Sequence, residues 1–264
     1  MILLLGGTTE GRQLSKIFQE MGLDFITAVV TDYGKELAEG DRSFGGRSST
    51  DSSSNVISGA LDKVKMVELI AAEKISLVVD ASHPFAEKAS LNAIEAAREK
   101  KTAYLRFERP CLEVLEHPLI RQVGTFLEGA REAVKTGEVI FLAIGVNHLE
   151  PFVREAKDYG KKVAARVLPT VSSLRKCRES GLNPSEIIAV QGGGSLELNR
   201  LLLKEFGADV LVTKESGREG GTENKIQAAL DLELPVIIVK RPVINYGSNI
   251  FTEVEEIIHY LEIW

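Results

Sequence analysis

Short β-rich segments alternate with helical patterns along almost the entire chain of 264 residues. The opening shows the pattern, because the apolar run 2–5 precedes a stretch, 10–21, in which apolar residues recur at helical spacing. A strand followed by a helix and a second strand forms a βαβ unit, which joins parallel strands. The alternation therefore predicts an α/β fold with mainly parallel sheets.

The chain is long enough for two domains, and prolines and glycines between residues 110 and 125 suggest the boundary. We expect two Rossmann-like domains, 1–120 and 121–264, with an interdomain cleft. The sequence leaves open whether the final segment, 245–263, caps the second domain or returns to the first. The predicted strands are 2–5, 25–31, 56–58, 76–80 and 103–107 in the first domain and 139–144, 162–166, 187–190, 209–213 and 236–240 in the second. The helices predicted by residue range are 10–21, 62–73 and 84–100, and a further helix begins near Thr222.

Composition excludes several classes of protein. The net charge of -6 argues against a general nucleic-acid binder. Cys111 and Cys177 are far apart and suggest neither a disulfide framework nor a zinc site. No apolar run approaches the length of a membrane span. We expect a cytoplasmic protein without a bound metal, a monomer or weak homodimer with no nucleic-acid or membrane partner.

The loop after the first strand has features of a phosphate-binding turn. Gly6 and Gly11 have the spacing of a P-loop, but Arg12 and Gln13 replace the required Lys and Ser/Thr, and GxGxxG is absent. Glycines, two threonine hydroxyls and a helix N-terminus remain, and these suit an anion. The alternative is an ordinary tight turn whose glycines serve packing. The predicted cofactor residues here are Gly6, Gly7, Thr8, Thr9, Gly11 and Arg12.

A second loop, 80–93, follows a buried strand. Asp80 ends that strand, Ser82 is placed to cap a helix, and Pro84 suits the first helical position. His83 lies where the strand meets the helix and can donate a proton near neutral pH, although a histidine in this position more often stabilises its loop. The predicted buried face of the helix is Phe85, Ala89, Ala93 and Ala96.

Two further loops carry positive charge. In the segment 212–225, Lys214 and Arg218 are placed to meet carboxylates or phosphates, with Ser216 and Thr222 as hydrogen-bonding neighbours; a solvated loop is the alternative. After the strand 103–107, Arg106 and Arg109 are expected to divide their roles, one facing the cleft and the other an acidic neighbour. The histidines are scattered and no HExxH or GxSxG motif is present, so a cofactor or the substrate is expected to carry the reactivity.

Taken together, these loops resemble the precorrin-6A reductase family of cobalamin biosynthesis. The resemblance covers residues 2 to about 242, and its middle portion looks like the cobalt-dependent branch. Two segments depart from the family pattern and affect the second domain: Gly193-Gly194-Ser195 replace Pro-Phe-Ser, and 143–152 lacks a Thr-Thr-Gly and a basic residue. The segments that carry the resemblance are "ILLLGGTTEGRQL", "VVDASHPFAEKASLNA", "YLRFERP", "RVLPT" and "VLVTKESGREGGTENKIQAAL" followed by "PVIIVKRP".

The resemblance implies NADPH and a tetrapyrrole held between two Rossmann-like domains, with reduction of one ring double bond. Asp32, at the end of the second strand, would alone favour NADH; we follow the family and expect Arg42 or Arg47 to meet the 2′-phosphate. The proton would come from Lys214, His83 or water, and Lys214 is the preferred donor with His83 as the second candidate. The cofactor set also includes Asp32, Arg47, Asp80 and Ser82, and the substrate set is Arg106, Arg109, Ser216, Gly217, Arg218, Gly221 and Thr222.

Two other functions remain open from the sequence. A glycosyltransferase with two Rossmann-like domains would bind a nucleotide sugar and no nicotinamide. A nucleotide-sensing module without catalysis would bind the cofactor without turnover.

Overall fold

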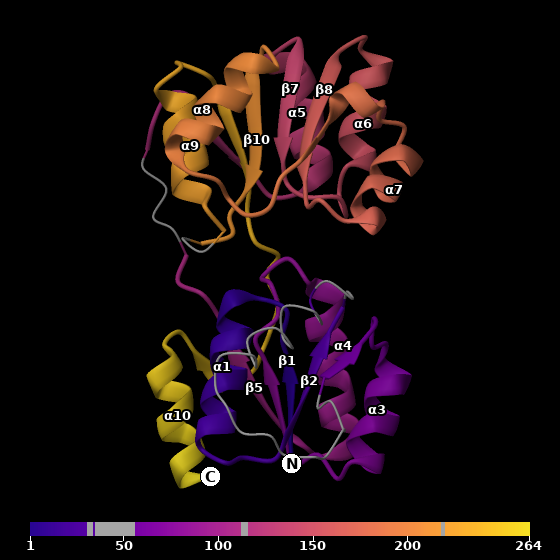
Figure 1. Cartoon of the computed structure of the whole chain (residues 1–264), viewed down its shortest axis with the longest axis vertical. Helices are drawn as coiled ribbons and strands as arrows, with labels where there is room; N and C mark the ends of the chain where they lie inside the picture. The colour runs from indigo at the N-terminus through magenta and orange to yellow at the C-terminus, as the bar shows by residue number, and fades with distance from the viewer. Residues whose placement is uncertain (31–33, 35–55, 112–115, 218–219) are drawn as a thin grey trace, which may run out of the picture. The chain divides into compact units, whose positions relative to one another are not determined.

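The structure is a computed structural model that describes residues 1–30, 34, 56–111, 116–217 and 220–264 (Figure 1). Its contacts divide the chain into two units. Unit 1 consists of Met1–Pro110 together with Val243–Trp264, and unit 2 is the continuous segment Cys111–Pro242. The final segment, whose destination the sequence left open, therefore belongs to unit 1.

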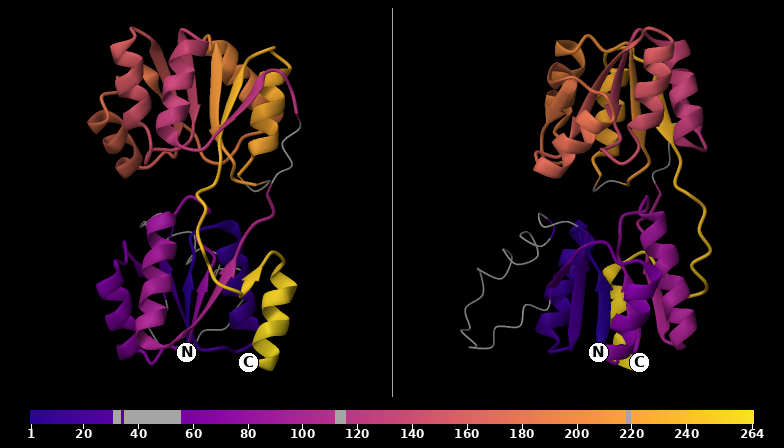
Figure 2. Two further views of the ribbon diagram at one scale, coloured as in Figure 1. Left: turned by 180° about the vertical axis from the view of Figure 1, so that it is seen from behind. Right: turned by 90° about the vertical axis from the view of Figure 1, so that its right-hand side faces the viewer.

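Unit 1 is built on a parallel sheet of six strands in the order β12-β5-β4-β1-β2-β3. Its two central strands, β4 and β1, are fully buried, as expected for a parallel sheet that is covered on both faces. The edge strand β12 comes from the end of the chain and pairs Ile250 with Arg106 (Figure 2). The elements are β1 (Ile2–Leu5), α1 (Thr9–Glu20), β2 (Phe25–Val29), β3 (Val56–Ser58), α3 (Lys63–Ala72), β4 (Leu77–Asp80), α4 (Glu87–Lys100), β5 (Ala103–Phe107), β12 (Ile250–Phe251) and α10 (Val254–Ile263).

The helices of unit 1 cover the two faces of this sheet in pairs. Helices α1 and α10 share one core, in which Leu14 and Phe18 pack together with Val254 and Ile257 (Figure 1). Helices α3 and α4 share the other core, with Met66 and Ile70 from α3 and three alanines from α4. Apolar residues three or four positions apart form each buried stripe, since this spacing places them on one helix face.

Unit 2 repeats the same architecture, with a parallel sheet in the order β6-β11-β10-β7-β8-β9. Helices α8 and α9 contribute to one core, and α5 and α6 pack together on the opposite face (Figure 2). The elements are β6 (Ile120–Val123), α5 (Phe126–Thr136), β7 (Val139–Ala143), α6 (Glu150–Asp158), β8 (Lys162–Val167), α7 (Val171–Glu179), the 3-10 helix η2 (Pro184–Glu186), β9 (Ile187–Ala189), α8 (Leu196–Glu205), β10 (Val210–Lys214), α9 (Thr222–Leu230) and β11 (Val236–Val239).

The predicted α/β fold with parallel sheets is confirmed, but three local expectations were wrong. The edge strands β6 and β12 were missed, because β6 is only partly buried and β12 has two residues. Helix α4 begins at Glu87 rather than at Pro84, because residues 84–86 form a turn and Ala86 is its N-cap. Its buried residues are accordingly Ser90, Ala93, Ala96 and Ala97.

Parallel strands bring all their carboxyl ends to one edge of a sheet, where ligands of open α/β folds bind. The loops that the sequence singled out lie at these edges, because each follows a strand directly. Among the described residues, no helix has both the length and the apolar character needed to cross a bilayer. The same residues contain no group of three or more His, Cys, Asp or Glu placed to hold a metal ion.

The start of α1 packs so closely on β1 that Gly11 leaves no room for a side chain. A Cβ at this position would lie 2.8 Å from Gly6 Cα. In an exposed helix, replacing Gly by Ala stabilises the fold by up to about 1 kcal/mol. At Gly11 the added methyl group would instead force the backbone to move. We therefore expect G11A to lower the free energy of unfolding by about 1–3 kcal/mol. Urea unfolding measures this change. K16A, at an exposed position of α1, is the control; a G11A protein as stable as wild type would contradict the close packing.

Candidate functional site

In unit 1, Thr8 joins the first loop to the neighbouring strand end. Its hydroxyl caps α1 by accepting a hydrogen bond from Gly11 N at 3.0 Å, and it donates to Ala81 O at 2.8 Å. Gly6 N donates to Ala28 O of β2 at 2.9 Å. The tight-turn alternative therefore describes three residues of this loop, Gly6, Thr8 and Gly11, whose contacts hold the turn against the neighbouring strands and α1.

The outward side of the same loop is open. Gly7 has φ +97° and an added Cβ would meet nothing within 4 Å. Thr9 is exposed, and Arg12 Nη2 donates to its hydroxyl at 3.3 Å. The other charged side chain of this loop, Glu10, turns inward: it is buried and accepts a hydrogen bond from Arg109 Nη2 at 2.6 Å. This arrangement leaves Gly7, Thr9 and Arg12 at the N-terminus of α1 for an anionic ligand.

The ends of β4 and β5 hold a fully buried ion pair. Arg106 Nη1 lies 3.0 Å from Asp80 Oδ1, and neither side chain is exposed. Arg106 Nη1 also donates to Ser82 Oγ at 3.2 Å, and Arg106 Nε donates to Glu108 Oε2 at 2.8 Å. The guanidinium carbon lies 4.8 Å from the centre of the Tyr246 ring. Two carboxylates and an aromatic face thus compensate for removing this cation from water.

Charge balance at this cluster sets the protonation states. Burial alone would raise the pKa of Asp80, but the Arg106 guanidinium and hydrogen bonds from Ser82 and Ser90 outweigh it and lower this pKa below its usual value. Tyr104 donates to Asp80 Oδ2 at 2.8 Å, and burial together with the Asp80 charge raises the pKa of Tyr104. Asp80 is therefore ionised and Tyr104 is protonated at neutral pH.

These contacts correct two expectations. Ser82 does not cap α4, because its N–H donates to Asp80 Oδ1 at 3.0 Å and its hydroxyl accepts from Arg106. The expected division, with only one arginine beside an acidic residue, is not found. Arg106 pairs with Asp80 and Glu108, and Arg109 pairs with Glu10. Direct contact of either arginine with a substrate stays a prediction.

His83 is half-buried in the turn before α4. Its Nδ1 accepts a hydrogen bond from Phe85 N at 3.1 Å, and its ring centre lies 5.9 Å from that of Phe85. This local contact matches the loop-stabilising alternative. A role in proton transfer stays a prediction.

In unit 2, the loop between β10 and α9 is stabilised by its own hydroxyl groups. Ser216 N donates to Thr222 Oγ1 at 3.3 Å, and the hydroxyls of both residues donate to Lys214 O at 3.4 Å. Gly217 and Gly221 have positive φ, which favours glycine. The structure thus brings together Lys214, Ser216, Gly217, Gly221 and Thr222, the described members of the predicted substrate loop.

A second glycine loop, 191–195, packs on the first. A Cβ at Gly193 would lie 2.7 Å from Gly221 Cα, so the two backbones are in direct contact. Asn199 holds this loop by donating to Gly193 O at 3.0 Å and to Ser195 O at 2.7 Å. Arg166 Nη1 in turn donates to Asn199 Oδ1 at 2.6 Å. The segment Gly193-Gly194-Ser195, which departs from the family pattern, therefore lies where the two glycine loops contact each other.

Sequence reasoning missed three basic residues around these loops. Arg166 and Lys225 are both buried, and Lys225 Nζ donates to Gly220 O at 2.7 Å. Burial, with the charges of Arg166 and Lys214, lowers the pKa of Lys225 to about 7. His148 stacks on Phe126 with ring centres 3.8 Å apart, and burial together with the Lys214 charge lowers the pKa of His148.

Some predicted residues cannot be placed. Asp32, Arg42, Arg47 and Arg218 lie outside the described residues. The two proton-donor candidates belong to different units, His83 to unit 1 and Lys214 to unit 2.

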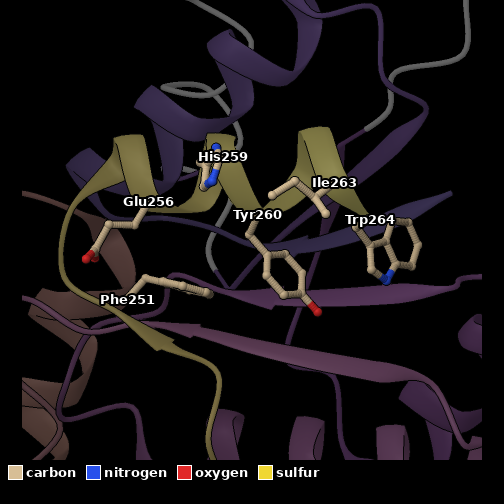
Figure 3. Close-up of a pocket in the computed structure, with 6 residues that line it drawn as sticks. All are labelled: Phe251, Glu256, His259, Tyr260, Ile263 and Trp264. Carbon is tan, nitrogen blue, oxygen red and sulfur yellow. The ribbon is translucent and has the colours of Figure 1, made fainter.

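An open hollow of about 530 Å³ lies beside α10 and the edge strand β12 of unit 1 (Figure 3). The one acidic side chain in its lining, Glu256, accepts hydrogen bonds from Thr252 N and Glu253 N at the start of α10. No predicted site residue lines this hollow, and the Glu256 side chain caps the N-terminus of α10. The lining residues are Phe251, Glu256, His259, Tyr260, Ile263 and Trp264.

The two parallel sheets, with glycine-rich and charged loops at the carboxyl ends of their strands, define an α/β protein of Rossmann-like type. The family model of precorrin-6x reductase CbiJ/CobK matches residues 1–262, and the chain belongs to this family of oxidoreductases. It is 38% identical to a cobalt-precorrin-6A reductase of Methanothermobacter thermautotrophicus, over 99% of this chain and 84% of that protein. It is 36% identical to that of Priestia megaterium, over 99% and 98%. The solved structure of CobK precorrin-6A reductase superposes with a TM-score of 0.77 at 23% identity, covering 99% of this chain and 96% of that one, which supports the fold.

The buried ion pair between Asp80 and Arg106 predicts that D80N strongly lowers the stability of the fold. The substitution leaves Arg106 with less compensation, so we expect a loss of about 3–5 kcal/mol in the free energy of unfolding at pH 7. Folding lowers the pKa of Asp80, so its contribution is present at neutral pH and is lost as the pH falls below about 4. Urea unfolding at pH 7 and pH 3.5 measures both effects. D24N, at an exposed carboxylate, is the control, and equal losses in the two variants would contradict this account.

Lys225 predicts an unusual pH dependence of stability. Folding lowers its pKa from 10.5 to about 7. The unfolded chain therefore binds more protons between these values, and stability rises with pH by up to about 1.4 kcal/mol per unit from this group. In K225M this rise should be lost and stability near pH 7 should increase. Urea unfolding at pH 6.5, 8 and 9.5 tests this, with K204M on the exposed side of α8 as control; parallel profiles of K225M and wild type would be contrary evidence.

Proposed function

We propose that this protein reduces one ring double bond of cobalt-precorrin-6A or metal-free precorrin-6A to the corresponding precorrin-6B, with NADPH as electron donor. The observation that carries the proposal is the family match, which extends over residues 1–262. The 38% identical relative is a cobalt-precorrin-6A reductase, and this supports the cobalt form as the substrate. A cytoplasmic location and a monomeric or weakly dimeric state belong to the same proposal.

The first loop of unit 1 fits the phosphates of a dinucleotide. Gly7 offers open backbone, Thr9 an exposed hydroxyl, and Arg12 a cation beside the N-terminus of α1. When bound, NADPH would supply the hydride that reduces the ring. Gly6, Thr8 and Gly11 would act by holding the loop in shape, and Asp80 and Ser82 by fixing the adjacent strand end.

The substrate carries many carboxylates, so an acidic protein must provide local positive charge. Lys214 stands at the end of β10, partly exposed, beside a glycine-rich loop that can approach a planar ring closely. We assign it the delivery of a proton to the carbon next to the one that receives hydride. His83 is the second candidate for this step.

If the protein is a precorrin-6A reductase, it should oxidise NADPH only when the macrocycle is present. Protein, NADPH and either cobalt-precorrin-6A or its metal-free form are mixed without oxygen, and nicotinamide absorbance and the macrocycle spectrum are followed together. NADH serves as the parallel control for the choice of cofactor. Tight NADPH binding without oxidation would contradict the reaction, and equal use of NADH and NADPH would contradict the cofactor assignment.

The proton-donor assignment predicts a selective defect in K214A. We expect kcat to fall by about 100-fold or more, because general acid catalysis contributes on this order, while NADPH affinity is unchanged. K204A provides a matched loss of an exposed lysine in unit 2. Unchanged turnover in K214A would remove Lys214 from this role, and H83A would then test the second candidate.

A further inference from the structure

Unit 2 contains two buried cations for which the described residues provide no acidic partner. The side chains of Arg166 and Lys225 belong to residues that are each only 6% exposed. Among the described residues, neither forms an ion pair with a carboxylate; their polar contacts are the amide oxygen of Asn199 and the carbonyl oxygen of Gly220. Lys225 has three N–H donors and Arg166 has five, so most remain available. Two like charges buried together destabilise a fold unless something else compensates for them.

These cations flank the contact between the two glycine loops. On one side, a Cβ added to Gly194 would lie 3.4 Å from Arg166 Nη1, which places the guanidinium directly beneath the loop 191–195. On the other side, Lys225 Nζ binds Gly220 O, and Gly220 O would lie 3.1 Å from a Cβ at Gly193. Asn224 joins the loops by donating to Gly194 O at 3.2 Å. Backbone without side chains therefore lies between the two charges.

Within the part of the chain that the structure describes, the elements packed on α9 place no carboxylate on Lys225, and Glu215, which follows β10, pairs with Arg241. The charges that act on Lys225 are Arg166 from β8 and Lys214 from β10, and both are positive. Strand β11 has no charged residue. On α8, Glu197, Lys204 and Glu205 are exposed, and Arg200 pairs with Glu197 and with Asp231. The local field is therefore positive.

We propose that Arg166 and Lys225, at the contact of the two glycine loops, form a subsite for an oxyanion of a bound ligand, either a carboxylate or a phosphate. The inference rests on the proposed function for the identity of that ligand, since the macrocycle offers carboxylates and the cofactor offers phosphates. The glycines allow a ligand to approach the backbone closely, as in other anion sites. The ligand charge offsets the two cations, so the subsite is stabilised when it is filled.

Calorimetric titration of wild type and K225M with NADP⁺ and with cobalt-precorrin-6A tests the subsite. At pH 8 much of Lys225 is neutral, because its pKa is about 7. An oxyanion beside it raises that pKa, so binding must take up protons, and two buffers of different ionisation enthalpy reveal this uptake. We expect wild type to take up a substantial fraction of a proton with one of the two ligands, more at pH 8 than at pH 6.

In K225M the uptake should disappear, and the affinity for that ligand should fall by about 10- to 100-fold, the amount expected for a hydrogen bond between charged groups. A loss for NADP⁺ alone identifies a cofactor phosphate, and a loss for the macrocycle alone identifies a carboxylate. K204M should bind both ligands like wild type. Unchanged affinity and unchanged uptake in folded K225M overturn the subsite.

The wild-type titration decides the question even if K225M fails to fold, because binding of both ligands without proton uptake at pH 8 also overturns it. The proposed function fails separately, if neither ligand binds wild type at all. In that case inorganic phosphate is titrated in the same two buffers. Proton uptake in wild type that is lost in K225M then supports the subsite, and its absence overturns it.

Discussion

A charge that is removed from water must be compensated, and the two units meet this constraint in different ways. Unit 1 surrounds the fully buried Arg106 with Asp80, Glu108 and the ring of Tyr246. Unit 2 buries Arg166 and Lys225, whose partners within the described parts of the chain are neutral oxygen atoms. Unit 1 therefore holds a pair that fixes the ends of two strands, whereas unit 2 carries an uncompensated positive field at its glycine loops. The same sheet architecture thus holds a compensated ion pair in one unit and, among the described residues, two buried cations without carboxylate partners in the other.

Most of the fold could be predicted from the sequence because parallel strands and their helices leave strong local patterns. All ten expected strands exist, and Thr222 begins α9 as expected. What could not be predicted depends on contacts between distant segments. Strand β12 is recognisable only through its pairing with β5, and the start of α4 is set by the turn at His83, whose ring accepts a hydrogen bond from Phe85 N.

The site was predicted less completely, because sequence shows which residues follow a strand but not how their charges are balanced. The glycine loops and Lys214 were found in this way. The partners of Arg109 and Arg106 were not foreseeable, since Glu10 and Arg109 are 99 positions apart in the chain. A signal for Lys225 did exist: it lies between Thr222 and Ala228 on the buried stripe of α9, where a lysine is unusual. No comparable local signal marks Arg166, whose role depends on Asn199 of α8.

The origin of β12 also affects how the chain is made. Unit 2 is one continuous segment between β5 and β12, so the ribosome synthesises all of unit 2 before it synthesises the last strand of unit 1. During that interval β5 is an open edge strand, with the unpaired N–H groups of Arg106 and Glu108 that later bind Asn249 O and Phe251 O. Open edges of this kind pair readily with other chains. The period between the synthesis of β5 and that of β12 is therefore when the chain is most exposed to aggregation.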